Sequence, residues 1–300
     1  MSMSSLMSRF HKLENDEERR RFEEDVDRFA SNFVGARGKA PRGTCSWIHY
    51  ATSTKMKKLR IGDLPPKERG HVRIVAISDT HFKHQDICVP PGDILVHAGD
   101  IFFLGGFYGT DTNEKRLRRF NAWMSRHPHR HKVVVGGNHD ALLENMCNSR
   151  IRSILSECDY LVNESRTFGD SGSELVIFGS PLSAPNSAAS PNMAFQGAAT
   201  AKELQLALAG LNHSVDVLLI HGPPGTLDES VREFIRVRRP RLVIHGHVHE
   251  TYGVTTLHES LVVNATTMGG TFSPVNPPVV VDLPLSKRQD PMGGATTPRL

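Results

Sequence analysis

Five short apolar stretches of this sequence each end on side chains that can bind a metal ion. The stretches begin near residues 72, 93, 131, 215 and 241, and the polar groups that follow them are Asp79 and His81, Asp100, Asn138 and His139, His221, and His247 and His249. In an open α/β sheet, ligands gather at the carboxyl ends of the strands, so side chains far apart in sequence meet in one crevice. The recurrence therefore predicts a single polar site built from all five stretches.

The types of donor atom indicate which ions this site would bind. Carboxylate oxygens, imidazole nitrogens and one amide oxygen, with no cysteine among them, favour manganese, iron or zinc over a soft metal. Two aspartates, one asparagine and four of these five histidines already exceed what one ion needs, so we expect two ions about 3.5 to 4 Å apart that share a bridging carboxylate. With two aspartates and a bridging hydroxide, two divalent ions leave a charge of about +1, which would attract a phosphate.

The stretch from residue 133 to 140 reads Val-Val-Val-Gly-Gly-Asn-His-Asp. Three β-branched residues indicate a buried strand, and the glycines allow a sharp turn and let a charged ligand approach the backbone closely. Taken alone, the same residues favour a strand followed by an ordinary Asx turn. The four similar strand ends elsewhere in the chain favour the functional interpretation.

The segments between these strands predict the architecture that positions the site. Helical periodicity runs over 114–125, 141–155, 201–211 and 227–237, so that helices separate several of the strands. Strands that alternate with helices predict a layered α/β fold. Residues 252–257, 261–263 and 279–283 resemble strands without helices between them, which predicts an antiparallel extension or a second sheet.

The composition limits the class of protein. The chain has 300 residues, 38% of them hydrophobic, which suits one globular domain with appendages or at most two domains. A formal charge of +4 is too weak to imply a nucleic-acid or membrane partner. The four cysteines lack Cys-x-x-Cys spacing, which favours free thiols in a reducing compartment. No run of about eighteen apolar residues exists, so we expect no membrane span.

The first seventy residues differ in character from the rest of the chain. A helix is predicted from Asn15 to Gly35, with Asn15 as its N-cap. Its apolar stripe consists of Phe22, Val26, Phe29 and Phe33. We expect this stripe to dock on the main domain. A partner helix or a membrane surface is the alternative, and the acidic residues of the helix argue against a surface of anionic lipid. Residues 38–66 lack periodicity and are interpreted as a linker with some local order.

In their order and spacing, several motifs resemble the signature of the calcineurin-like metallophosphoesterases. These motifs are Asp79-x-His81, Gly99-Asp100, Gly137-Asn138-His139-Asp140, His221 and Gly246-His247-x-His249. The phrases His221-Gly-Pro-Pro and Gly179-Ser-Pro further resemble its metallophosphoesterase-domain-containing subgroup. The resemblance implies an α/β fold of two mixed β-sheets packed face to face and flanked by helices, in four layers. It also implies an N-terminal extension over residues 1–70, a catalytic domain over 71–283 and a flexible tail over 284–300.

The resemblance assigns a role to each residue of the site. Asp79, His81 and His249 would hold one divalent metal, Asn138, His221 and His247 the other, and Asp100 would bridge them. His139 would not bind metal; it would lie beside the scissile phosphate and assist the leaving group. Asp140 would hold the His139 imidazole in orientation. A hydroxide that bridges the two metals, manganese ahead of iron or zinc, would attack phosphorus.

The function implied is hydrolysis of small phosphodiesters, with cyclic nucleotides among the candidates. Alternatives are a phosphomonoesterase or protein phosphatase, and a weakly catalytic protein that binds metal or a nucleotide. His247 and His249 are both present, which favours an active enzyme. Two basic clusters, at 126–132 and 232–241, lack the interleaved aromatic residues that single-stranded nucleic acid requires, so a nucleic-acid partner is not expected.

The segment from Ser180 to Thr200 is rich in Pro, Ser and Asn, and Phe195 is its only aromatic residue. We expect it to cover the metals, with a surface excursion as the alternative. The expected location is the cytoplasm. An N-terminus free of acidic residues until Glu14 and the final Pro298-Arg299-Leu300 offer mitochondrial and peroxisomal alternatives. The sequence does not indicate the oligomeric state.

Overall fold

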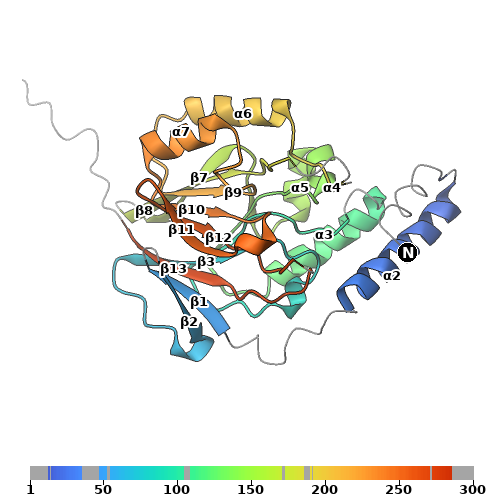
Figure 1. Cartoon of the computed structure of the whole chain (residues 1–300), viewed down its shortest axis with the longest axis horizontal. Helices are drawn as coiled ribbons and strands as arrows, with labels where there is room; N and C mark the ends of the chain where they lie inside the picture. Colours follow the sequence, from blue (N-terminus) through green and yellow to red (C-terminus); the bar gives the residue numbers. More distant parts are fainter. Residues whose placement is uncertain are drawn as a thin grey trace, which may run out of the picture.

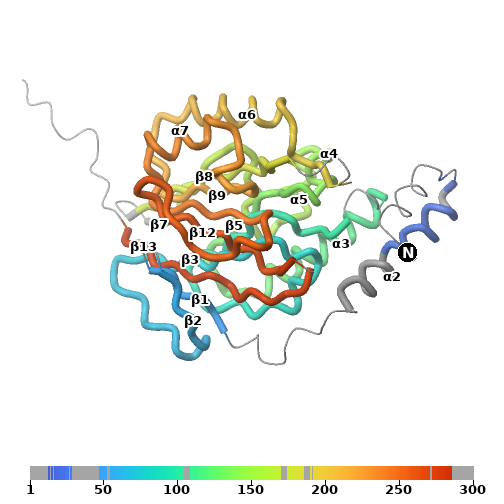
Figure 2. The backbone as a smooth tube through the Cα atoms, viewed as in Figure 1, coloured from blue at the N-terminus to red at the C-terminus, as the bar shows by residue number. Residues whose placement is uncertain are grey.

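The chain folds into two mixed β-sheets that pack face to face and are flanked by helices, as expected (Figure 1). The computed structural model describes residues 13, 15–35, 47–52, 55–104, 109–170, 173–185, 190, 192–270 and 272–285. The N-terminal twelve residues, most of the expected tail, and residues 36–46 of the chain lie outside this description. Figure 2 traces the same backbone and shows how the two sheets lie between the helices.

The first sheet has seven strands in the order β2-β1-β13-β3-β4-β5-β6. Strands β3 to β6 are parallel to one another, whereas β13 runs antiparallel to β3 and parallel to β1. Their bounds are β1 (Trp47–Thr52), β2 (Lys55–Arg60), β3 (His71–Ile77), β4 (Ile94–His97), β5 (His131–Val134), β6 (Asp159–Tyr160) and β13 (Val279–Pro284).

The second sheet has six strands in the order β11-β12-β10-β9-β8-β7. Its four central strands are parallel, and β11 and β7 run antiparallel at its two edges. Their bounds are β7 (Glu164–Asp170), β8 (Ser173–Ser180), β9 (Val217–Ile220), β10 (Leu242–His245), β11 (Gly253–Leu257) and β12 (Ser260–Asn264).

Helices cover the outer face of each sheet. The first sheet packs on α3 (Thr110–Met124), α4 (Ala141–Asn145) and α5 (Asn148–Ile154), and the second on α6 (Ala198–Ala209) and α7 (Glu229–Arg238). The 3-10 turns are η2 (Ile61–Asp63), η3 (His84–Asp86) and η5 (His249–Thr251). Alternate residues of β3 serve the two faces: Ile74 and Ala76 point into the core between the sheets, and Val75 and Ile77 pack under the helices.

The N-terminal helix α2 (Asp16–Gly35) docks on the domain, as expected from its apolar stripe. Phe22 and Val26 are fully buried. The Glu23 carboxylate accepts hydrogen bonds from the Gly109 N–H at 2.6 Å and the Thr112 hydroxyl at 2.7 Å, and so caps the start of α3. Among the described residues, no helix has the length and apolar character needed to cross a membrane.

The structure differs from the sequence-based expectations in three places. The linker predicted over 38–66 contains two strands, β1 and β2, so this prediction is wrong there. Strand β1 pairs with β13, which lies 230 residues away in the sequence, and local periodicity does not reveal such a pairing. The helix expected over 141–155 is two helices, because the backbone is extended at Met146 and Cys147. The hairpin of β7 and β8 was not expected at all. The proposed division of the chain at residue 70 stays a prediction.

Stability should depend on pH through His84. The imidazole is buried against Phe120 and Trp123, and burial, reinforced by the charges of Arg126 and His127, lowers its pKa from 6.5 to about 4. The unfolded chain binds a proton there as the pH falls through 6.5, whereas the folded protein does not until about 4. Protons therefore favour unfolding in this window, and stability is lost as the pH falls.

We expect His84→Phe to reduce that acid-induced loss of unfolding free energy by up to about 3 kcal/mol. Chemical denaturation of both proteins across the window measures it. His258→Phe, at the exposed turn between β11 and β12, is the matched control for replacing a histidine by phenylalanine at a surface position. Equal slopes for the parent and His84→Phe would contradict the assignment.

Candidate metal centre

All nine predicted site residues lie at the carboxyl ends of five parallel strands. Asp79 and His81 follow β3, Asp100 follows β4, Asn138, His139 and Asp140 follow β5, His221 follows β9, and His247 and His249 follow β10. The first three strands belong to one sheet and the last two to the other. The site is therefore built from residues of both sheets and lies where the strand ends of the two sheets meet.

Sharp backbone turns bring these side chains to the rim. Four of the seven expected metal ligands have positive φ angles: Asp79 at 52°, His81 at 42°, Asp100 at 59° and His247 at 72°. Left-handed backbone is disfavoured for residues other than glycine and costs on the order of 1–3 kcal/mol each. Four such residues within one site indicate that the fold imposes the strain to hold these side chains in place.

Two motif glycines are required by close contacts at the site. A Cβ atom on Gly137 would lie 2.3 Å from Asp100 Oδ1, and one on Gly246 would lie 2.1 Å from Asp79 Oδ2. Any side chain at either position would collide with a carboxylate of the cluster. The glycines of the Gly-Asn-His-Asp and Gly-His-x-His motifs thus make room for the two aspartates.

Asp79, His81 and His249 form the first group of donors. The Nε2 atoms of His81 and His249 lie 3.3 Å apart, and Asp79 Oδ1 lies 3.5 Å from His249 Nε2. The Nδ1–H of His81 donates to the Phe102 carbonyl at 2.7 Å. The Nδ1–H of His249 donates to the Gly269 carbonyl at 3.3 Å. These bonds leave both Nε2 lone pairs facing one point, the arrangement that a cation between them would satisfy.

Asn138, His221 and His247 form the second group. Asn138 Oδ1 lies 3.0 Å from His221 Nε2 and 2.7 Å from His247 Nδ1. The Asn138 amide donates to the Asn192 carbonyl at 3.2 Å, which directs its oxygen toward the imidazoles. His221 donates from Nδ1 to the Ala98 carbonyl at 2.7 Å, so its Nε2 also points into the group.

The buried Asp100 carboxylate lies between the two groups. Its Oδ1 is 3.4 Å from His221 Nε2 and its Oδ2 is 3.9 Å from His81 Nε2. Burial would raise the pKa of Asp100, but the neighbouring imidazoles, His221 first, hold it well below its usual range. Burial likewise opposes the shift at His221, where the Asp100 carboxylate raises the pKa to about 9. The carboxylate therefore needs positive charge beside it, which divalent ions also supply.

His139 approaches the same carboxylate from the open side of the site. Its backbone N–H donates to Asp100 Oδ1 at 2.9 Å, its Nε2 lies 3.9 Å from Asp100 Oδ2, and its side chain is 12% exposed. Its Nδ1 donates to the Phe103 carbonyl, so Nε2 is the atom that faces the site.

Asp140 does not contact the His139 imidazole, so the expectation that it orients this ring is wrong. Its carboxylate instead accepts three backbone N–H groups, from Gly137 at 2.8 Å, Asp100 at 2.9 Å and Phe102 at 2.9 Å. Burial and the nearby Asp100 charge raise the pKa of Asp140 to about 8. Asp140 thus joins the turn after β4 to the turn after β5 and sets the backbone position of Asp100.

A model of the family described as calcineurin-like phosphoesterase matches residues 72–251. The chain belongs to this family. It is a metal-dependent phosphoester hydrolase, and the matched residues include every predicted site residue.

Relatives of this phosphoesterase support the subgroup as well. "Metallophosphoesterase domain-containing protein 1" of Homo sapiens is 32% identical over 256 residues, which cover 73% of each chain. A "UPF0046 protein" of Caenorhabditis elegans is 30% identical over 71% of this chain and 82% of its own length. "Probable rhamnogalacturonate lyase C" of Emericella nidulans is 31% identical over 76% of this chain, but the match covers only 21% of that protein.

The donors of this phosphoesterase fit divalent metal ions. Asp79 with His81 and His249, and Asp79 with Asp100 and His221, each form a cluster whose ligand atoms lie within 4.8 Å of one another. A third such cluster combines His81, Asp100 and His139. Oxygen and imidazole donors that face one another at these distances suit the divalent ions on which the family depends.

Sequence reasoning missed two aromatic residues at the site. The ring of Phe272 lies 5.0 Å from that of His81 and 4.9 Å from that of His249, and 5.0 Å from the ring of Phe103. Phe103 was detectable as part of the apolar Phe102-Phe103-Leu104 run after Gly-Asp. Phe272 stands alone in a turn, where periodicity carries no signal.

Part of the segment expected as a cover does lie against the site. The Ala194 N–H donates to the Asn138 carbonyl at 3.1 Å, and a Cβ on Gly136 would lie 2.6 Å from the Phe195 ring. Ser183 and Phe195 are also joined by a backbone hydrogen bond of 3.0 Å. Residues 186–189 and 191 of this segment lie outside the described residues.

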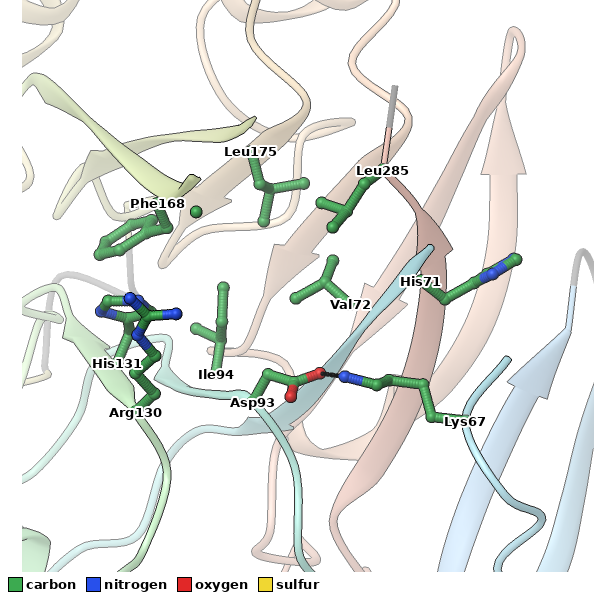
Figure 3. A pocket seen from close by; sticks show the side chains of 11 residues that line it. Lys67, His71, Val72, Asp93, Ile94, Arg130, His131, Phe168, Leu175 and Leu285 are labelled. Atoms are coloured by element: carbon green, nitrogen blue, oxygen red, sulfur yellow. Dashed lines mark hydrogen bonds and ion pairs between the residues drawn. The ribbon is translucent and has the colours of Figure 1, made fainter. Parts of the chain in front are cut away.

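A cavity of about 200 Å³ lies at the opposite ends of the strands from the metal site, where β3, β4 and β5 begin (Figure 3). Val72, Ile94 and Leu175 form its apolar wall, and a Lys67–Asp93 ion pair lies at its side. None of the nine site residues lines it. Phosphoester chemistry therefore belongs to the carboxyl ends of the strands and not to this cavity.

Gly137→Ala should damage the site selectively. Its new Cβ would displace Asp100, and we expect it to lower the free energy of unfolding by about 1–3 kcal/mol and to reduce bound metal. Gly225→Ala is the matched control, because nothing lies within 4 Å of a Cβ there. Denaturant unfolding and elemental analysis measure both effects. Full metal content in Gly137→Ala would refute the close-contact argument.

Proposed function

We propose that this chain hydrolyses small phosphodiesters, cyclic nucleotides among the candidates, at a pair of divalent ions. Manganese is the first candidate for both ions, with iron and zinc behind it. The observation that carries the proposal is the meeting of six oxygen and nitrogen donors in two groups around the buried Asp100 carboxylate. In this proposal Asp79, His81 and His249 bind one ion, Asn138, His221 and His247 bind the other, and Asp100 is shared.

The bound ions would supply Lewis acidity toward the phosphate oxygens and an activated water. The protein's own contribution is orientation, because backbone carbonyls hold Nδ1 of His81, His221 and His249 and so aim each Nε2 at the ions. These bonds keep the donors in place before substrate binds.

His139 is the proposed proton donor to the leaving group. Its Nε2 faces the site, while Nδ1 stays bound to the Phe103 carbonyl. Burial lowers the pKa of His139, and the Asp100 carboxylate and the Phe103 carbonyl oppose that shift by favouring the imidazolium. An imidazolium at this point can pass its Nε2 proton to the departing alkoxide oxygen.

A small substrate suits this site better than a folded phosphoprotein. The side chains of His139 and His249 are only 12% and 9% exposed, so they offer little area to a bulky protein surface. A small monoester could enter, which keeps phosphomonoesterase activity as the alternative.

The proposal does not include a nucleic-acid partner. Arg232 and Arg236 of the second basic cluster form ion pairs with Glu229 and Glu233 on the same helix. Such pairing reduces the positive potential available to a phosphate backbone. The proposed location is the cytoplasm, since none of the described cysteines takes part in a disulfide.

The substrate class can be tested with a metal-activated panel. We expect bis-p-nitrophenyl phosphate to be hydrolysed with a higher kcat/KM than p-nitrophenyl phosphate or a phosphopeptide, and manganese to activate best. Steady-state kinetics of the protein reloaded with each metal provide the measurement. Faster turnover of the phosphopeptide would replace the proposal with protein phosphatase activity. No turnover of any substrate, with both metals bound, would favour a binding protein.

His139→Ala should keep its metal and lose turnover. We expect kcat to fall by about 100-fold or more for a diester with an alkyl leaving group, which needs a proton to depart. The fall should be smaller for bis-p-nitrophenyl phosphate, because p-nitrophenolate departs readily as an anion.

Asp100→Ala is the opposite control, since the loss of the shared carboxylate should reduce bound metal by elemental analysis. His213→Ala, far from the site, should change neither metal content nor rate. Parental rates for His139→Ala on both diesters would remove His139 from the mechanism.

A further inference from the structure

Two phenyl rings form a wall on one side of His139. The ring centroids of Phe103 and Phe272 lie 5.0 Å apart and are nearly perpendicular, at 85°. The His139 ring lies 6.5 Å from Phe103 and 6.2 Å from Phe272. Phe103 is buried, whereas Phe272 is half-buried.

Phe272 lies in a turn that imposes an unfavourable backbone conformation on it. Its φ angle is 54°, in the left-handed region that a bulky side chain rarely adopts. The turn that carries it is closed by hydrogen bonds from the Phe272 N–H to the Gly269 carbonyl and from the Gly269 N–H to the Ser273 carbonyl, both 2.9 Å. The Gly269 carbonyl also accepts the Nδ1–H of His249. One turn thus orients an expected metal ligand and presents a phenyl ring beside it.

The position of the wall bears on the leaving group. If His139 Nε2 donates its proton to the leaving oxygen, the group attached to that oxygen would lie near the Phe272 ring, whose centroid is 6.2 Å from that of His139. Aromatic rings attract one another at centroid distances of about 4.5–7 Å in edge-to-face or offset geometry. A planar ring on the leaving group would gain this contact, whereas a short alkyl group would not.

We propose that Phe272, supported by Phe103, makes this phosphoesterase select substrates that carry a planar aryl ring next to the scissile phosphate. The selection rests on the proposed function, because it requires a phosphoester bound beside His139. Phe272 is a specificity residue in this scheme: a water oxygen would form the new bond to phosphorus, the P–O bond to the leaving group would break, and the leaving oxygen would take its proton from His139 whether or not the ring is present.

The test compares phenylphosphonate with methylphosphonate, whose P–C bonds resist hydrolysis. Calorimetry on the manganese-loaded full chain should give a Kd about ten-fold lower for phenylphosphonate. Phe272→Leu should reduce that ratio to about two-fold or less, because it keeps apolar volume but removes the ring. Phe272→Tyr, which keeps the ring, should retain the preference.

Phe168→Leu is the matched control, since this buried phenylalanine lies on β7 and lines the cavity at the far ends of the strands from the metal site. It should leave the ratio at the parental value. An unchanged ratio in Phe272→Leu would overturn the proposal. An equal loss of both phosphonates together with bound metal would overturn it as well, because Phe272 would then only support the rings of His81 and His249.

The same measurements separate this proposal from the proposed function. If the manganese-loaded parent binds neither phosphonate, phosphoester binding at the site fails, and the selectivity fails with it. If the parent binds both phosphonates equally well, the phosphoester site stands and only the aromatic preference is lost.

Discussion

The structure depends on one buried negative charge, the carboxylate of Asp100. It lies between two groups of imidazole and oxygen donors, and its own pKa and that of His221 are displaced in opposite directions because each stabilises the charge of the other. A carboxylate removed from water requires cations or hydrogen-bond donors around it. The three backbone N–H groups bound by Asp140 hold the two turns that meet this need.

The two-sheet architecture explains why the donors meet. Asp79, Asp100 and Asn138 come from one sheet, and His221 and His247 come from the other. The distance between the groups is therefore set by the apolar core that packs the sheets together, which includes side chains of β3, β4, β5, β9 and β10. Close packing makes that spacing rigid, and glycines at the strand ends let the polar loops approach within hydrogen-bonding distance.

Backbone groups carry out most of the fine positioning. Four histidines of the site are fixed by carbonyl oxygens, those of Ala98, Phe102, Phe103 and Gly269. Three of these carbonyls, those of Ala98, Phe102 and Phe103, follow β4, and Glu23 of the N-terminal helix binds the Gly109 N–H further along the same connection. The helix outside the family match thus contacts the same loop that orients His81 and His139.

The sequence alone determined the polar residues of the site and the strands that carry them, because a buried parallel strand is a local apolar run and a turn after it needs glycine and short polar groups. It also determined the docking helix, through the spacing of Phe22 and Val26. Only the tertiary structure determined the features that depend on contacts between segments far apart in the sequence. In the tertiary structure β1 pairs with β13, and Phe272 lies beside three histidines. The Asp140 carboxylate accepts hydrogen bonds from backbone amides and does not bind the His139 ring. The physical reason is that a contact made across the core leaves no periodic pattern in either of the two segments that form it.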